Sequence, residues 1–190
     1  MAKDNLMALD LAEPAALPRD LAAQYAAARE RLGFVPNVLR AYAHAPDRLA
    51  NFIAMRDGLM ASDSGLTKAE REMIAVVVSS LNRCHYCLTS HGATLRRLTG
   101  DPPLADTLAM NFRAAGLPDR QRAMLEFVER LTQAPECIED ADRDLLREQG
   151  FGERDIWDIA EVTGFFNMTN RLAAATGMEP NREYYDLHRR

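Results

Sequence analysis

The apolar positions of this chain recur three and four residues apart over most of its length, which is the spacing of one face of an α-helix. In the segment after Thr67, for example, Ile74, Val77 and Leu81 fall on one such face. Glycines and prolines stand between the periodic segments, where helices end. The predicted helices cover residues 19–32, 38–43, 47–60, 67–81, 84–99, 103–114, 119–133, 140–149 and 153–176. Strands have little support, so the pattern predicts an all-α fold.

Two of these helices form a predicted hairpin in the middle of the chain. The run Thr67 to Glu70 has the sequence of a capping box, in which a threonine and a glutamate three residues later satisfy the free N–H groups of a helix start. Asn82 and Arg83 break the pattern before the helix 84–99 begins. The run Val76 to Val78 is therefore expected to be helical despite its β-propensity.

The chain is expected to fold as a single domain over residues 1–190, because no low-complexity linker divides it. The tail after Gly177 carries Tyr184 and Tyr185. We expect it to lie over the body of the protein or over a neighbouring subunit.

Charge and hydropathy exclude several classes of partner. The chain of 190 residues has 23 Lys and Arg against 28 Asp and Glu, a net charge of −5, which disfavours nucleic acid. The longest apolar run, Met73 to Val78, is far shorter than the roughly 20 residues of a membrane span. The N-terminal stretch has an early Asp4 and no continuous apolar segment, so we expect no secretory signal and a cytoplasmic protein. In a reducing compartment three cysteines indicate metal or redox chemistry rather than structural disulfides.

The most informative motif is Glu72-x11-Cys84-His85-Tyr86-Cys87-x3-His91. On a helix beginning near residue 84, the two cysteines and His91 stand at positions i, i+3 and i+7, on one face. Glu72 lies about as far before the break at residue 82 as His91 lies after it, so an antiparallel hairpin brings these two side chains level. The spacing predicts a chain of contacts from Glu72 to His91 to Cys87.

This order suits thiol chemistry. A free thiol has a pKa of about 8.5 and reacts as the thiolate, so a base must take its proton. His91, oriented by the Glu72 carboxylate, is the candidate base, and the positive end of the helix favours a thiolate at Cys84 or Cys87. Attack of a thiolate on a peroxide leaves a sulfenic acid, and a second thiol one turn away condenses with it to a disulfide.

Other readings of these residues remain open. A CxxC motif can be half of a zinc site, with Cys137 and His44 recruited by folding. A thioredoxin-like fold is disfavoured, because it needs strands around the motif and the sequence shows no βαβ pattern. Tyr86, beside Cys87, either lines a substrate pocket or packs in the core.

At Glu72, Cys84, Cys87 and His91 the sequence resembles the alkylhydroperoxidase D-like (AhpD-like) family of the carboxymuconolactone decarboxylase superfamily, whose signature is Glu-x11-Cys-x-x-Cys-x3-His. The run from Leu66 to Asp101 resembles the core of that family, which extends here over about residues 47–134, with further helices and the tail in 135–190. A C-terminal group of residues resembles the subgroup called peroxidase-related enzymes; it comprises Glu161, Phe165, Phe166, Asn167, Asn170 and Arg171.

The resemblance implies an AhpD-like helical fold, with a hairpin that carries the CxxC at a helix N-terminus, in a homotrimer or hexamer. It implies a peroxidase that reduces organic hydroperoxides with a dithiol or lipoyl-type reductant and without haem, flavin or metal. By this resemblance Cys87 is the peroxidatic thiol, Cys84 the resolving thiol, His91 the proton relay and Glu72 its general base. The helix-terminus argument alone favours Cys84 as the more acidic thiol.

Two alternatives differ in what the thiols do. A decarboxylase on the same fold is disfavoured, because the decarboxylases of this superfamily lack the paired cysteines. A redox-sensing or disulfide-exchange protein would oxidise its cysteines without peroxidase turnover. The number of turnovers per subunit separates the sensor from the enzyme.

Overall fold

The computed structural model describes residues 6–12 and 14–189, so Asp4 lies outside the described residues. Within them the fold is all-α, as predicted. The α-helices are α1 (Arg19–Leu32), α2 (Asn37–Tyr42), α3 (Pro46–Met60), α4 (Lys68–Leu81), α5 (His85–Thr99), α6 (Pro102–Asn111), α7 (Asp119–Gln133), α8 (Asp140–Glu148) and α9 (Glu153–Thr176). Three short 3₁₀ helices complete the described part: η1 (Phe112–Ala114), η2 (Pro135–Cys137) and η3 (Arg182–Tyr185).

The predicted helix ends agree with the observed ones closely, with one exception. The helix expected over 103–114 is an α-helix only as far as Asn111, and η1 follows it. The backbone of Asn111 is extended, and its side-chain oxygen accepts a hydrogen bond from the N–H of Arg113, which caps the new turn. A polar residue that can bond its own backbone offers the chain an alternative to the helix, and here that alternative wins.

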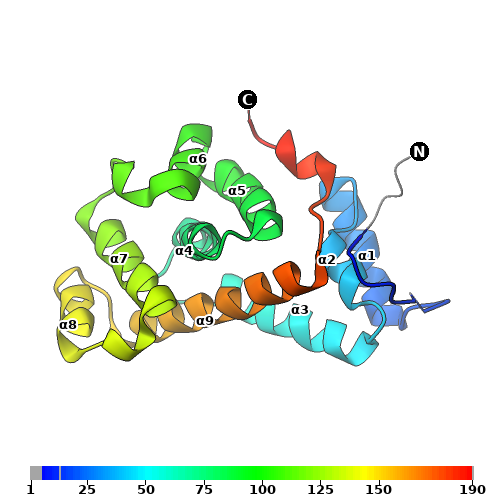
Figure 1. The fold of residues 1–190 in the computed structure, drawn as a ribbon, viewed down its shortest axis with the longest axis horizontal. Coiled ribbons are helices and arrows are strands. Elements are labelled where there is room, and N and C mark those ends of the chain that lie inside the picture. Colours follow the sequence, from blue (N-terminus) through cyan, green and yellow to red (C-terminus); the bar gives the residue numbers. More distant parts are fainter. Residues whose placement is uncertain (1–5, 13, 190) are drawn as a thin grey trace.

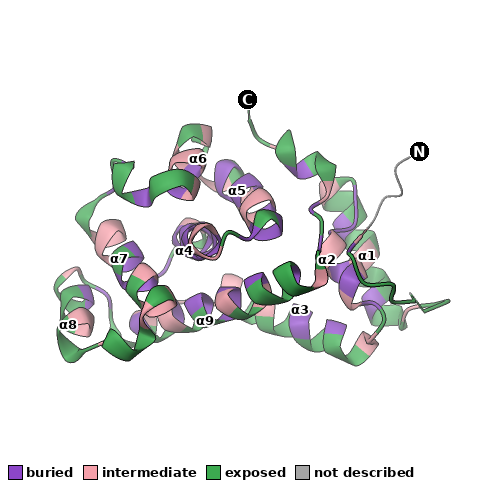
Figure 2. Ribbon diagram, in the orientation of Figure 1, coloured by how far each residue is buried: buried purple, intermediate pink, exposed green. Residues whose placement is uncertain are grey.

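Helix α4 is the centre of the molecule, with α5, α6, α7 and α9 packed around it (Figure 1). Its middle residues are buried on every side, which Figure 2 shows as an almost continuous purple helix. The side chains of Ile74, Val76 and Val78 are fully enclosed. A helix that is enclosed on every side can carry apolar residues on all its faces, which explains the valine run.

A buried ion pair fixes α4 against α9. The guanidinium of Arg71 lies 2.9 Å from the carboxylate of Asp158, and both side chains are almost completely buried. Arg71 also donates to the carbonyl of Leu59 at 2.7 Å and to the hydroxyl of Ser64 at 2.6 Å. Because the acceptors of its hydrogen bonds lie in three segments, the Arg71 side chain links the start of α4 to the end of α3 and to α9.

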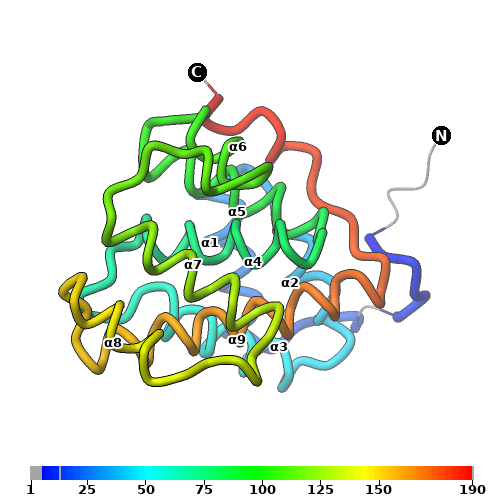
Figure 3. Tube along the Cα trace, turned by 60° about the vertical axis from the view of Figure 1, so that its left-hand side comes forward, coloured from blue at the N-terminus to red at the C-terminus, as the bar shows by residue number. Residues whose placement is uncertain are grey.

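The C-terminal segment turns back after α9 and lies over the same chain. Gly177 ends α9 in the left-handed conformation, with a φ of 61°. Figure 3 shows the segment, in red, rising from the end of α9 toward α5 and α6. Arg96 of α5 holds it by donating to the carbonyls of Tyr184 and Leu187 at 2.9 and 3.0 Å. Of the two positions expected for the tail, the structure shows the one over the body.

None of the described helices is long and apolar enough to cross a membrane.

Candidate active site

A tight turn between α4 and α5 places the two cysteines. Arg83 takes a left-handed conformation with a φ of 53°, unusual for a residue other than glycine, and this reverses the chain. The N–H of Cys84 then bonds the carbonyl of Ser79 at 2.9 Å. Cys84 becomes the N-cap residue of α5, and Cys87 lies in its first turn. Both are free thiols and both are buried.

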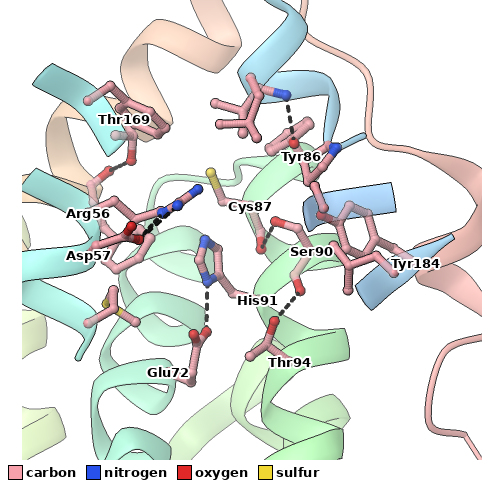
Figure 4. Close-up of a pocket in the computed structure, with 18 of the residues that line it drawn as sticks. Arg56, Asp57, Glu72, Tyr86, Cys87, Ser90, His91, Thr94, Thr169 and Tyr184 are labelled. Atoms are coloured by element: carbon pink, nitrogen blue, oxygen red, sulfur yellow. Dashed lines mark hydrogen bonds and ion pairs between the residues drawn. The ribbon is translucent and has the colours of Figure 1, made fainter. Parts of the chain in front are cut away.

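The hairpin also brings Glu72 and His91 together. Nδ1 of His91 lies 2.7 Å from a carboxylate oxygen of Glu72. A carboxylate can only accept, so Nδ1 carries the proton and Nε2 is left as the acceptor. Phe166 packs edge-on against the imidazole, with ring centroids 4.6 Å apart. Figure 4 shows the nitrogen that does not bind Glu72 turned toward the Cys87 side of the site.

The two thiols interact with each other and differ in acidity. The hydrogen bond from Cys87 lowers the pKa of Cys84 to about 7, against the effect of burial. The backbone N–H groups of Cys87 and Tyr86 lower it further, as does the charge of His91 when its imidazole is protonated. The same hydrogen bond and burial raise the pKa of Cys87 well above its usual value. The shared hydrogen bond and the backbone N–H groups therefore favour the thiolate on Cys84 over that on Cys87, which agrees with the helix-terminus argument.

A buried polar network surrounds Cys87. Hydrogen bonds from Asn170 and Ser79 to the sulfur oppose the rise in its pKa. The side-chain amide of Asn170 also donates to Ser79 at 3.1 Å, and Asn82 donates to the Asn170 oxygen at 3.1 Å. Sequence reasoning from spacing alone did not find this network, because Asn170 lies on α9, far from the motif. Only the family resemblance drew attention to Asn170.

The cysteine side of this site opens on a cleft of about 730 Å³ between α1, α2, α3, α4, α5, α9 and the C-terminal segment. Cys87 and His91 are among its lining residues, whereas Cys84 is not. Tyr86 also lines the cleft, and its hydroxyl accepts a hydrogen bond from the backbone N–H of Val38 at 2.9 Å. Of the two thiols, Cys87 is thus the one that a molecule in the cleft meets.

Two candidates from the sequence lie elsewhere. Cys137 is exposed in η2, and His44 bonds the carbonyl of Ala41 at 2.9 Å in the turn before α3. Over residues 6–12 and 14–189, no three His, Cys, Asp or Glu side chains are grouped so that they could hold a metal ion.

The sequence profile of the carboxymuconolactone decarboxylase family matches residues 46–130. A peroxidase-related protein from Silicibacter sp. TM1040 is 53% identical, with a TM-score of 0.96 over 100% of this chain and 99% of that one. A peroxidase-related protein from Ralstonia eutropha JMP134 with an alkylhydroperoxidase AhpD core is 44% identical, with a TM-score of 0.94 over 98% of each chain. The debrominase Bmp8 shares the fold at 20% identity and a TM-score of 0.74, over 87% of this chain and 88% of that one. Among curated proteins none matches the chain.

Proposed function

The chain belongs to the AhpD-like proteins of the carboxymuconolactone decarboxylase superfamily, and from this membership and the geometry of its site we propose that it is a cysteine-based peroxidase. The observation that carries the proposal is the alignment of Glu72, His91 and Cys87 at the edge of the cleft, with a second thiol one turn away. The substrate is an organic hydroperoxide and the reductant is a dithiol of the lipoyl type. The protein works without haem, flavin or metal, as a cytoplasmic homotrimer or hexamer.

In the first step Nε2 of His91 takes the proton of Cys87, and the thiolate attacks the terminal oxygen of the hydroperoxide. The O–O bond breaks, a sulfenic acid forms on Cys87, and the alkoxide leaves as an alcohol with the proton from His91. Glu72 stabilises the imidazolium that exists between these two proton transfers. Cys87 loses two electrons and the peroxide gains them.

In the second step the Cys84 thiolate attacks the sulfenic sulfur, the S–O bond breaks, and hydroxide leaves as water after taking a proton from the solvent. A thiolate is required here too, and the backbone N–H groups of Cys87 and Tyr86, which lower the pKa of Cys84, remain in place in this step. A dithiol then reduces the disulfide to two thiols and becomes a disulfide itself. The cleft-facing and the more acidic cysteine are therefore different residues with different tasks.

The test is consumption of cumene hydroperoxide in the presence of excess dihydrolipoamide. We expect many turnovers per subunit for the wild type, and none for Cys84→Ser or Cys87→Ser. Cys137→Ser is the matched control, because this cysteine is exposed and outside the cleft. A single turnover, ending in a stable disulfide with several dithiols tried, would contradict the peroxidase and identify a redox sensor.

Two further reactions belong in the same experiment. Bmp8 is a debrominase, and a cysteine-to-alanine variant of it forms a complex with 2,3,4-tribromopyrrole. Bromide release from that compound measures whether the thiols of this chain act on carbon–halogen bonds. Carbon dioxide release from a carboxymuconolactone measures the decarboxylase alternative. We expect neither product.

A further inference from the structure

The cleft next to Cys87 differs in charge from the chain as a whole. The chain has a net charge of −5, yet four Lys and Arg side chains line the cleft against two carboxylates. Both carboxylates are engaged: Glu72 binds His91 and Asp57 binds Arg56. The four cations are Arg31, Arg56, Lys68 and Arg97. A concave surface of one sign attracts ligands of the opposite sign.

Tyr184 adds an unused hydrogen-bond donor to the same cleft. The residue is 7% exposed and its ring packs edge-on against Phe34, with centroids 4.9 Å apart. Its hydroxyl has no hydrogen-bond partner among the described residues, and it is not sealed in the core, since Tyr184 lines the cleft. Burial raises the pKa of this phenol above its usual value, so that it stays protonated at neutral pH. A donor without a protein partner that faces open space is available to an acceptor on a ligand.

Two of the cations and two carboxylates act on this hydroxyl. The charges of Arg56 and Arg31 oppose the rise in the pKa of the Tyr184 phenol, whereas the carboxylates of Glu72 and Glu183 add to it. Arg56 uses Nε and one Nη atom on a single oxygen of Asp57, which leaves its other Nη free. Arg31 makes no hydrogen bond or ion pair within the described residues. In Figure 4, Arg56 and Tyr184 stand on opposite sides of Cys87 and His91.

We propose that Tyr184, Arg31 and Arg56 form a carboxylate-binding subsite of the cleft, and that the substrate is an organic hydroperoxide that also carries a carboxylate. Guanidinium groups bind carboxylates through charge-assisted hydrogen bonds, and a phenol supplies a further donor. The apolar body of the ligand has Phe165, Phe166 and Leu98 to pack against in the same cleft. The subsite rests on the proposed function only in that the carboxylate belongs to a hydroperoxide.

Binding tests the subsite without any turnover. The probes are 4-isopropylbenzoate and the uncharged 4-isopropylbenzamide, which differ in charge and hardly in shape. Isothermal titration calorimetry on the reduced protein should give a dissociation constant for the carboxylate at least about tenfold lower than for the amide. The ratio should fall as sodium chloride is raised from about 50 to about 500 mM, because salt screens partly exposed charges.

Three variants locate the effect. In the double variant Arg31→Gln/Arg56→Gln, the dissociation constants of the amide and the carboxylate should become nearly equal. In Tyr184→Phe the preference for the carboxylate should fall several-fold. Arg29→Gln is the matched control, because Arg29 is exposed on the same helix as Arg31 and does not line the cleft. Equal binding of the two probes, or a preference that survives the double variant, would overturn the subsite.

Activity then separates the subsite from the peroxidase reaction. The substrates are cumene hydroperoxides with a carboxylate or a carboxamide at the para position. We expect the carboxylate to have the higher kcat/KM through a lower KM, with a similar kcat. Consumption of both without preference would refute the subsite and leave the peroxidase standing. Consumption of neither, with the calorimetric preference intact, would refute the peroxidase and leave the subsite.

Discussion

The low pKa of Cys84 depends on the neighbouring Cys87 thiol, and removing that thiol should raise the pKa. The hydrogen bond from the Cys87 thiol is the largest cause of the lowered pKa of Cys84, which stands at about 7. In Cys87→Ala this donor is lost, while the backbone N–H groups of the helix terminus remain. We expect the pKa of Cys84 to rise by at least one unit. In Cys87→Ser the hydroxyl still donates, so the rise should be smaller.

The size of the effect follows from the pKa values. At pH 7 a thiol with a pKa of about 7 is about half ionised, whereas one with the ordinary pKa of about 8.5 is about 3% ionised. The difference of about 1.5 units corresponds to about 2 kcal/mol in favour of the native thiolate. Such a change is well above the error of a titration.

The assay is thiolate absorbance at about 240 nm, followed from pH 5 to 9 in a Cys137→Ser background. The Cys137→Ser change removes the exposed thiol, so that the signal comes from Cys84 and Cys87 alone. The Cys84→Ser variant supplies the baseline, since burial still raises the pKa of Cys87 when the Cys84 thiol is gone. An unchanged midpoint in Cys87→Ala would refute the reasoning, as would a parent protein without a thiolate below about pH 8.5.

Other side chains of the site and core give further expected outcomes. His91→Ala should lower the peroxidase kcat by about 10²-fold. Glu72→Gln should lower it less, because the imidazole keeps its place and loses only its charged partner. Equal rates of hydroperoxide consumption for His91→Ala and wild type would exclude the relay. Asn170→Ala should lower the free energy of unfolding in urea by about 1–3 kcal/mol, because it leaves buried polar partners unsatisfied. An unchanged urea midpoint would contradict this expectation. Burial raises the pKa of Asp158, but hydrogen bonds, chiefly from Arg71, outweigh it and lower the pKa. The contribution of Asp158 to stability is therefore present above its unfolded pKa of about 4 and is lost as the pH falls below that value. Asp158→Asn should have a lower free energy of unfolding in urea than wild type at pH 7, and this difference should narrow below about pH 4. A difference that stays constant with pH would contradict the ion pair.

The fold could be predicted from sequence because its signals are local. Helical periodicity, the capping box at Thr67 and the glycines at helix ends each act within a few residues, and the predicted ends match the structure closely. The meeting of Glu72 and His91 followed from counting residues on either side of a turn. The early end of α6 was missed, because it depends on whether Asn111 bonds its own backbone or continues the helix. That competition is decided by small energy differences that no periodic pattern reveals.

The rest of the site could not be predicted because it is assembled by distant segments. Asn170 reaches Cys87 from α9, and Tyr184 reaches the cleft from a segment that follows the last long helix. Each needs the tertiary packing of a whole helix or tail to be known before its side chain can be placed. The acidity of the thiols is a further case, since it depends on which sulfur donates to the other.

The separation of tasks between the two cysteines follows from where the hairpin puts them. The hydrogen bond from the Cys87 thiol, together with the backbone N–H groups of the helix start, makes Cys84 acidic, but its N-cap position leaves it outside the lining of the cleft. Cys87, one turn later, faces the cleft but has its pKa raised by burial and by the shared proton. It can therefore become a nucleophile only when a base takes that proton, which is why His91 and Glu72 are needed at this level of the hairpin. A protein with a single acidic thiol facing the cleft would need no such base. The loss of activity in His91→Ala therefore measures how far acidity, on Cys84, is separated from access to the cleft, on Cys87.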